Sequence, residues 1–257
     1  PSTVLLDHRL EHDHHGRLLG WSDGTQQRRY LVDATGRLLQ AAHRSAVGSA
    51  QFWRFAYDAQ GNRRFAQAPT PNAPAGLTQK FQRDGLSNRL ASPGRSTPGQ
   101  TSQQAWDAAG RLVRNGRWSY RWDADGRLEQ ASWDGSPVAR YRYNHRGQRI
   151  ARQVGGQVTH YLYDAQRRLL AELDERGTVQ RQYLYLADWP VAVLDRIRAP
   201  ETPENSVASA RPVFQIRFLH LNHLGAPELV TNIRGQVLWR ATYAPFGRRL
   251  AGSEPAP

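Results

Sequence analysis

The sequence has no cysteine and no methionine, and Lys80 is the only lysine among its 35 basic residues. Without cysteine, a disulfide framework, a Cys-ligated zinc site and a thiol nucleophile are all excluded. The chain also lacks any run of about 18 apolar residues, so no membrane-spanning helix is predicted. Because the chain begins Pro-Ser-Thr and has no Met, we expect an excerpt or a processed piece, and a missing signal peptide says nothing about export.

The charge balance is strongly basic, with a formal net charge of +13 over 257 residues. This excess makes nucleic acid or an acidic surface the first partner to consider. The Arg residues, however, are spread along the chain and many stand close to an Asp. Since Arg suits carboxylate pairing across strands, we favour a structural and solvating role for them. An acidic protein partner and nucleic acid are the less favoured alternatives.

One short skeleton recurs along the chain: an aromatic or apolar residue, Asp or Asn, two variable residues, Gly and often Arg-Leu. It is found in "HDHHGRLLG" from residue 12, "VDATGRLLQ" from 32, "YDAQGNRRF" from 57, "WDAAGRLVR" from 106, "WDADGRLEQ" from 122, "YNHRGQRIA" from 143 and, in decayed form, "YDAQRRLLA" from 163. Asp is favoured at the first position of a type I turn, and Gly supplies the left-handed residue of the loop. The skeleton therefore predicts a hairpin loop with a bulge, joining two antiparallel strands.

The predicted turn fixes which residues stand opposite each other. It places Asp123 opposite Arg127, Trp122 opposite Leu128 and Arg121 opposite Glu129. Elsewhere it gives the pairs Asp13–Arg17, Asp33–Arg37 and Asp107–Arg111 on one face, and Val32–Leu38, Trp106–Leu112 and Tyr163–Leu169 on the other. The residues predicted to build the repeated turns are Asp13, Gly16, Asp33, Gly36, Tyr57, Asp58, Gly61, Trp106, Asp107, Gly110, Trp122, Asp123, Gly126, Tyr143, Asn144, Gly147, Tyr163 and Asp164.

The pattern as a whole predicts an all-β array of antiparallel hairpins, forming a curved, extended sheet with no helical segment. A β-propeller, whose blades also repeat four strands, is the alternative. We expect the repeat region to cover residues 1–250, with a tail or linker at 251–257. Loops rich in Pro and Ser or Ala are expected at 66–76, 91–104 and 196–212.

These repeats resemble the YD repeats of Rhs-type proteins. The segment "LNHLGAPELVTNIRGQVLWRATYAPFG", residues 221–247, is similar to the block that closes the Rhs core. The block residues that carry this likeness are His223, Leu224, Gly225, Gly235, Tyr243, Pro245, Phe246 and Gly247. The resemblance covers nearly the whole chain, most loosely at 66–104.

The resemblance implies a large sheet that spirals into a hollow shell around a toxic C-terminal polypeptide. Relatives of this type include C components of insecticidal toxin complexes, effectors of type VI secretion, wall-associated contact toxins and teneurins. In such proteins an aspartyl self-cleavage site among Asp-Pro motifs lies beyond the closing block. This chain has no Asp-Pro dipeptide and no toxin-sized segment after the repeats, so we expect a shell fragment without protease or payload.

The function expected from this resemblance is structural: a non-enzymatic module of a bacterial toxin, with no cofactor. Its partners would be the remainder of the shell, an enclosed toxin domain and a delivery-system protein, and free sheet edges would permit self-association. The location would be outside the producing cell, by secretion or delivery. A cell-surface adhesion or carbohydrate-binding module is the alternative function.

Three motifs with apparent chemistry are interpreted as structural. "GWSDG", residues 20–24, matches a nucleophile elbow, but a strand-like segment stands where a helix is required. "EHDHH", residues 11–15, offers His12, His14 and His15 as weak metal ligands, although Asp13 to Gly16 also fits the first turn of the array. His220 and His223 would need a partner carboxylate, for which Glu228 is the nearest candidate. We therefore predict no catalytic residue.

Overall fold

The computed structural model describes residues 7–45, 50–70, 73–83, 90–91, 104–197 and 213–250. Every regular element among these residues is a β-strand, which confirms the predicted all-β class. The chain divides into two compact units, Pro1–Ser102 and Gln103–Pro257. None of the described residues forms a helix long and apolar enough to cross a membrane.

The first unit is built on a seven-stranded sheet with the order β1 to β7. Its strands are β1 (Arg9–His12), β2 (Leu18–Ser22), β3 (Gln26–Val32), β4 (Leu38–Ser45), β5 (Gln51–Tyr57), β6 (Arg63–Thr70) and β7 (Ala73–Lys80). A separate two-stranded sheet pairs β8 (Gln82–Arg83) with β9 (Leu90–Ala91).

The second unit is built on a thirteen-stranded sheet with the order β10 to β22. Its strands are β10 (Gln104–Trp106), β11 (Leu112–Asn115), β12 (Trp118–Trp122), β13 (Leu128–Trp133), β14 (Ser136–Tyr143), β15 (Arg149–Val154), β16 (Gln157–Tyr163), β17 (Leu169–Leu173), β18 (Val179–Leu186), β19 (Trp189–Ile197), β20 (Val213–Leu221), β21 (Pro227–Thr231) and β22 (Val237–Arg240).

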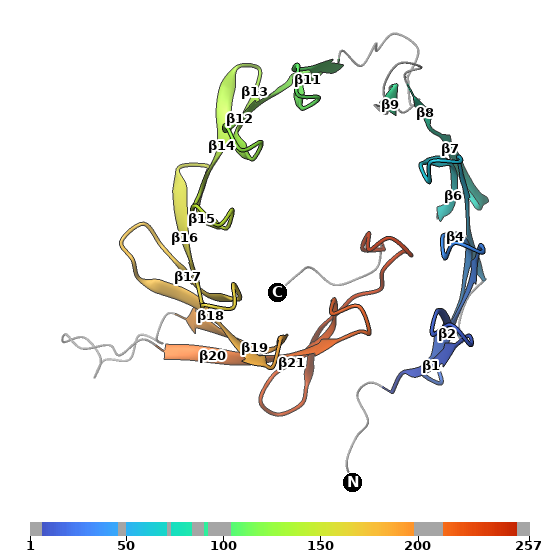
Figure 1. Cartoon of the computed structure of the whole chain (residues 1–257). Coiled ribbons are helices and arrows are strands. Elements are labelled where there is room, and N and C mark those ends of the chain that lie inside the picture. Colours follow the sequence, from blue (N-terminus) through green and yellow to red (C-terminus); the bar gives the residue numbers. More distant parts are fainter. Residues whose placement is uncertain are drawn as a thin grey trace. The chain divides into compact units, whose positions relative to one another are not determined.

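Strand order in both large sheets equals chain order, and every pair is antiparallel. This is the predicted meander of hairpins. The propeller alternative is wrong, because a propeller divides its strands into separate four-stranded blades. Figure 1 shows that the second sheet bends along its strand order into an arc, with the turns after β10, β12, β14 and β16 on the inner side.

The register beside the turns agrees with the prediction for four pairs and differs for one. Trp122 pairs with Leu128, Val32 with Leu38, Trp106 with Leu112 and Tyr163 with Leu169. Arg121, however, pairs with Gln130, because a bulge lies between the pairs of Arg121 and Trp122. Equivalent shifts occur next to the turn in other units, for example at Ala56/Tyr57 and Arg142/Tyr143. Such bulges increase the local twist of a hairpin.

The segment 66–76 is predicted from the sequence to be a loop, and this prediction is wrong. Strand β6 extends to Thr70 and β7 begins at Ala73. Pro69 lies at a register shift of the β6–β7 pair, and Pro74 lies in the last strand of its sheet. Bulges and edge strands are the places where a sheet tolerates the missing proline N–H. The predicted loops at 91–104 and 196–212 and the tail at 251–257 lie almost entirely outside the described residues.

The motif "GWSDG" closes the β2–β3 hairpin, as its interpretation as a turn requires. The Asp23 N–H donates to Gln26 O at 3.1 Å, and the Thr25 N–H and hydroxyl both donate to the Asp23 carboxylate. Strand β3 comes directly after the turn. A nucleophile elbow needs a helix at this point, so the segment does not present Ser22 as a nucleophile.

Candidate functional site

The most regular feature of the chain is the hydrogen-bonded turn after each aromatic strand end. At Asp123 the main-chain N–H donates to Arg127 O at 2.9 Å, and the Gly126 N–H donates to Asp123 O at 3.0 Å. One carboxylate oxygen accepts the N–H groups of Asp125 and Arg127, and the other accepts the Arg127 Nε–H at 2.7 Å. The side chain of Asp123 therefore holds both the backbone of the turn and the next Arg.

Other turns repeat this geometry. The Nε–Oδ2 distance is 2.6 or 2.7 Å in the pairs Asp13–Arg17, Asp33–Arg37, Asp107–Arg111 and Asp164–Arg168. Gly16, Gly36, Gly61, Gly110, Gly126 and Gly147 all have φ between 76° and 83°. The predicted left-handed glycines are confirmed. In the decayed seventh unit Arg167 stands in the glycine position with φ 69°, a conformation that is costly for a residue with a Cβ.

Each Arg also reaches the next turn along the sheet. Arg127 Nη1 donates to Asn144 O at 3.1 Å, and Arg111 Nη1 donates to Asp123 O at 3.0 Å. The guanidinium of Arg127 also lies over the aromatic ring of the next unit, 5.2 Å from the ring centroid of Tyr143. A cation over an aromatic face is electrostatically favourable. The same contacts join Arg37 to Asp58 and Tyr57, and Arg168 to Ala187 and Tyr185.

The aromatic residues also form hydrogen bonds, in the opposite direction, to the preceding hairpin. The Tyr143 hydroxyl donates to Leu128 O at 3.0 Å, and the Trp122 indole N–H donates to Leu112 O at 2.9 Å. Tyr57, Tyr163 and Tyr185 make the equivalent bond to the preceding hairpin. The sequence predicts Asp–Arg pairs and aromatic pairs on opposite faces. Instead the long Arg side chain reaches the neighbouring turn, and in each compact unit of the chain Arg and aromatic residues form a row of contacts between hairpins, which we call the Arg–aromatic ladder. The ladder is interrupted where Asn62 and Gln148 stand in place of the Arg.

The ladder lowers the pKa of its carboxyl groups. The backbone N–H of Arg111, together with its side chain, holds the pKa of Asp107 below its usual value, and Arg127 does the same for Asp123. For Asp13 desolvation is the largest influence and raises the pKa. The hydrogen bonds from Arg17 and His15 outweigh it and lower the pKa to about 2. These carboxylates remain ionised near neutral pH.

Further turns of the same type were not predicted as units. Asp174, Asn222, Asn232 and Ala244 each receive the N–H of the Gly three residues later, at 2.9 or 3.0 Å. Asp174 and Asn222 follow an apolar residue and fit the skeleton as it stands. Asn232 follows Thr231, and only Ala244 needs a different residue at the Asp position. The closing "YAPFG" is thus a turn without a carboxylate, in which Tyr243 still donates to Pro227 O. In the same block Leu224 and Phe246 are exposed.

Gly225 is under a different constraint from the other turn glycines. A Cβ built on it would lie 2.5 Å from Cζ3 of Trp189, whereas a Cβ on Gly235 would meet nothing within 4 Å. Trp189 lies two residues after Ala187, which has φ 50° in the two-residue turn after β18. This turn lacks the Asp-x-x-Gly skeleton, and the Trp189 ring packs on the turn that contains Gly225.

The histidine motifs do not assemble a site. His14 and His15 lie exposed in the first turn with ring centroids 3.8 Å apart, and His12 ends β1. Asp13, their neighbour, bonds to Arg17 and to the turn N–H groups. Over the described part of the chain, no group of three or more His, Asp or Glu is placed to hold a metal ion. His220 Nε2 lies 3.0 Å from the Thr231 hydroxyl, so a hydroxyl and not Glu228 engages that nitrogen.

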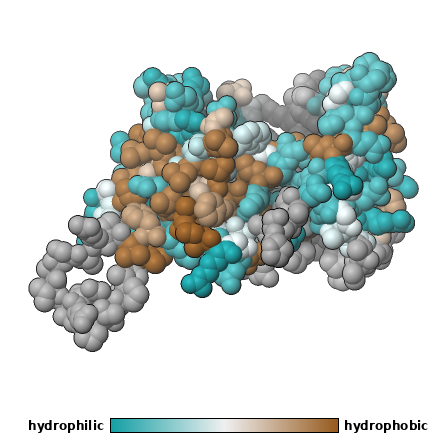
Figure 2. Space-filling model, turned by 90° about the horizontal axis from the view of Figure 1, so that it is seen from below, coloured by the Kyte–Doolittle hydropathy of each residue, from teal (hydrophilic) through white to brown (hydrophobic). Residues whose placement is uncertain are grey.

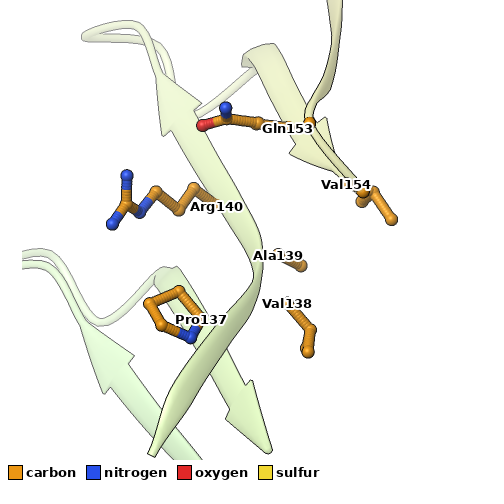
Figure 3. Close-up of a pocket in the computed structure, with 8 residues that line it drawn as sticks. Pro137, Val138, Ala139, Arg140, Gln153 and Val154 are labelled. Carbon is orange, nitrogen blue, oxygen red and sulfur yellow. The ribbon is translucent and has the colours of Figure 1, made fainter.

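A shallow cleft of about 630 Å³ lies at the outer ends of β14 and β15. In Figure 3, Pro137, Arg140 and Gln153 point to one side of the strands, and Val138 and Val154 point to the other. None of the residues that line it is an acid, a histidine or a nucleophile. The cleft therefore offers no acid–base chemistry.

Comparison with protein families gives two matches. The family described as "Teneurin YD-shell" matches residues 79–193, and the family described as "RHS protein" matches residues 216–251. The first covers the turns at Asp107, Asp123, Asn144 and Asp164, and the second covers the whole closing block, residues 221–247.

Comparison with curated proteins gives distant relatives. The double-stranded DNA deaminase toxin A of Burkholderia cenocepacia is 26% identical over 254 residues, covering 93% of this chain and 15% of the relative. The tRNA nuclease WapA of Bacillus subtilis is 28% identical over 134 residues, covering 51% of this chain and 5% of the relative. The chain thus spans only a small part of the length of these proteins.

Solved structures show the same fold at lower identity. The TcdB2-TccC3 crystal structure aligns with a TM-score of 0.70 at 17% identity, covering 96% of this chain and 14% of that one. The Photorhabdus luminescens Tc holotoxin pore aligns with a TM-score of 0.69 at 17% identity, covering 95% and 13%. A likeness at this level concerns the fold of the hairpin array.

Proposed function

The chain is an Rhs/YD-repeat protein, and we propose that it is a structural module that builds part of a β-shell around a C-terminal effector polypeptide. The repeat region would cover residues 1–250, and residues 251–257 would connect it to the effector side of a longer protein. The chain itself would perform no catalysis. The nuclease and deaminase activities in the names of its relatives would belong to other domains of those longer proteins.

The observation that carries this proposal is the Arg–aromatic ladder. Its aromatic side chains pack beneath neighbouring hairpins and donate hydrogen bonds to them. An adhesion or glycan-binding module would present such rings to solvent for stacking. The Arg Nη1 and Tyr hydroxyl bonds of the ladder join one hairpin to the next, as expected of a repeat array that forms a wall. We therefore favour a scaffold over adhesion.

The partners would be the rest of the shell, the enclosed effector and a delivery-system protein, type VI secretion being one such system. The place of action would be outside the producing bacterial cell. The enclosed polypeptide would gain protection from proteases, because a closed wall excludes them. Nucleic acid is not proposed as a partner, since many of the Arg side chains are already paired with turn carboxylates.

Limited proteolysis of the longer protein that carries this chain tests the proposal. We expect the polypeptide after the repeats to resist digestion in the native protein and to be cut once the ladder is weakened by Arg127→Gln with Arg168→Gln. Arg121→Gln, on an exposed pair with Glu129, is the control and should leave protection intact. Equal digestion in native and ladder-weakened protein would refute enclosure. Specific glycan binding on an array, lost in Trp133→Ala, would favour adhesion instead.

A further inference from the structure

One face of strands β14 to β20 combines apolar and basic side chains. Leu162 pairs with Ala171, Ala171 with Gln182, Gln182 with Leu194, and Leu194 with Ile216, so these side chains share one face. A parallel row joins Leu184, Ala192 and Phe218. The exposed fractions of Leu162, Leu184 and Phe218 are 51%, 45% and 37%. We call Leu162, Leu184, Leu194, Ile216 and Phe218 the leucine patch.

The patch lies on the side of the sheet away from the ladder. Figure 2 shows an apolar area over this part of the second unit, seen from below the arc of Figure 1. The opposite face carries Tyr161, Tyr183 and Tyr185, which alternate with the patch residues along the strands. The proposed shell function does not use this outer face.

Basic groups flank the leucine patch. Arg142 pairs with Ala151, and Ala151 with His160, two residues before Leu162 on β16. Arg142 is therefore on the same face, as are Arg140 and, at the other side, Arg196. All three are exposed.

Carboxylates are confined to the other face in this part of the sheet. Glu172 accepts the Tyr183 hydroxyl at 2.6 Å, and Asp195 binds Arg181 at 2.6 Å and also Arg217. Among the described strand positions of β14 to β20, none on the patch face is Asp or Glu. The charged strand residues beside the leucine patch are therefore all basic, and no carboxylate on the described strands of this face neutralises them.

We propose that the leucine patch and its flanking arginines dock an acidic amphipathic helix of another polypeptide. The apolar side of such a helix would cover the leucines, and its carboxylates would pair with Arg142 and Arg196. From β14 to β20 is about 29 Å at the usual spacing of strands, which a helix of about 20 residues spans. A strand does not fit, because the backbone groups here are already bonded within the sheet.

Two other occupants fit less well. A second copy would bring the same face with its own Arg140, Arg142 and Arg196, and these like charges would repel. An anionic membrane favours apolar side chains that protrude from loops, whereas the patch residues stand on the strands of a sheet and are about half covered or more. Charge complementarity thus selects an acidic polypeptide.

The test measures binding of labelled 20-residue helical peptides to the 257-residue chain by fluorescence anisotropy. One peptide carries a leucine stripe with Glu on its other positions, and its twin carries Lys in place of Glu. We expect the Glu peptide to bind and the Lys peptide to bind at least tenfold more weakly. Leu184→Gln and Arg142→Glu should each weaken the Glu peptide at least tenfold. Leu31→Gln, at a leucine of the first unit with 56% exposure, should not change it.

Every other outcome overturns the proposal. Equal binding of both peptides, no binding of either, or loss in the Leu31→Gln control would show that the patch is not the site. A dimer in light scattering that Leu184→Gln dissociates would identify a second copy as the occupant. Binding to phosphatidylglycerol vesicles that Leu184→Gln abolishes, without binding of the Glu peptide, would identify a membrane. Circular dichroism melting of each variant confirms that it is folded.

Discussion

At the scale of single residues, the turn aspartates bind both main chain and side chain. Asp123 satisfies two turn N–H groups and an Arg at once, so its ionised form is favoured in the folded state. A carboxyl group whose pKa is lower in the folded chain stabilises it above the unfolded pKa. That contribution disappears as the pH falls through the folded pKa.

We therefore expect acid to weaken the fold in a definite window. Stability from Asp13 should be complete above about pH 4 and be lost as the pH falls toward about 2. Asp107 and Asp123 shift in the same direction. Urea unfolding midpoints at pH 7, 4, 3 and 2 measure the effect, and Asp123→Asn should flatten the slope. A midpoint that stays constant between pH 4 and 2 would contradict the assignment.

Gly225 and Gly235 offer a matched pair of residues. Both have φ near 75°, so alanine at either position costs about 1–2 kcal/mol of backbone strain. At Gly225 the new Cβ would also overlap the ring of Trp189, which should add about 1–3 kcal/mol. Guanidinium unfolding of Gly225→Ala and Gly235→Ala compares them directly. In a Trp189→Ala background the extra cost at Gly225 should vanish, and its persistence would mean that the ring is not the cause.

At the scale of elements, one Arg side chain adds contacts between each hairpin of the ladder and the next. The Arg127 side chain is 25% exposed and contacts Asp123, Asn144 and Tyr143. We expect Arg127→Gln to destabilise the chain clearly more than Arg121→Gln does, because it removes hydrogen bonds to the carboxylate of one turn and to the backbone of the next. Arg121→Gln removes only an exposed pair with Glu129 and should stay within about 1 kcal/mol. The denaturant midpoints of the two variants, compared at equal m-values, measure this difference. Equal losses of stability in both variants would show that the ladder contacts add nothing.

The hairpins and their turns could be predicted from the sequence because their chemistry is local. Asp, Gly and the preceding aromatic residue define one turn without reference to the rest of the fold. The bulge that moves Arg121 opposite Gln130 was not predicted, because the turn residues define the pairs next to the loop and not the register further along the strands. The strands around Pro69 and Pro74 were missed for a related reason: proline is acceptable there only because of a bulge and a sheet edge.

The contacts between turns could also not be predicted from the sequence pattern. Arg-Leu after the Gly is visible in most units, but the pattern indicates a partner across the same hairpin only. That Arg37 lies over Tyr57 of the next unit depends on strand spacing and side-chain length. The Trp189 contact with Gly225 has no repeated signature.

At the scale of the whole molecule, an open meander has an edge strand at each end, and one side of that strand has no partner within the sheet. Strand β1 is the first in its sheet and all four of its residues are exposed. Exposed edges pair with other strands unless charge or proline protects them. We predict that this edge is paired, with more shell or with a second copy of the chain.

Light scattering with size-exclusion chromatography at several concentrations tests this prediction for the chain alone. We expect self-association that increases with concentration, together with slow amide exchange in β1, residues 9–12. A monomer that stays soluble at high concentration and exchanges these amides rapidly would show that the edge needs no partner. Leu184→Gln leaves the edge unchanged and separates this association from one through the leucine patch.

The sequential strand order has a consequence for how the protein is made. Each strand of the second sheet pairs only with strands adjacent to it in the chain. A hairpin leaving the ribosome can therefore dock at once on the one synthesised before it, without waiting for a distant segment. Such local order favours rapid folding. The sheet would extend as translation proceeds, so that it is folded before any polypeptide encoded downstream leaves the ribosome.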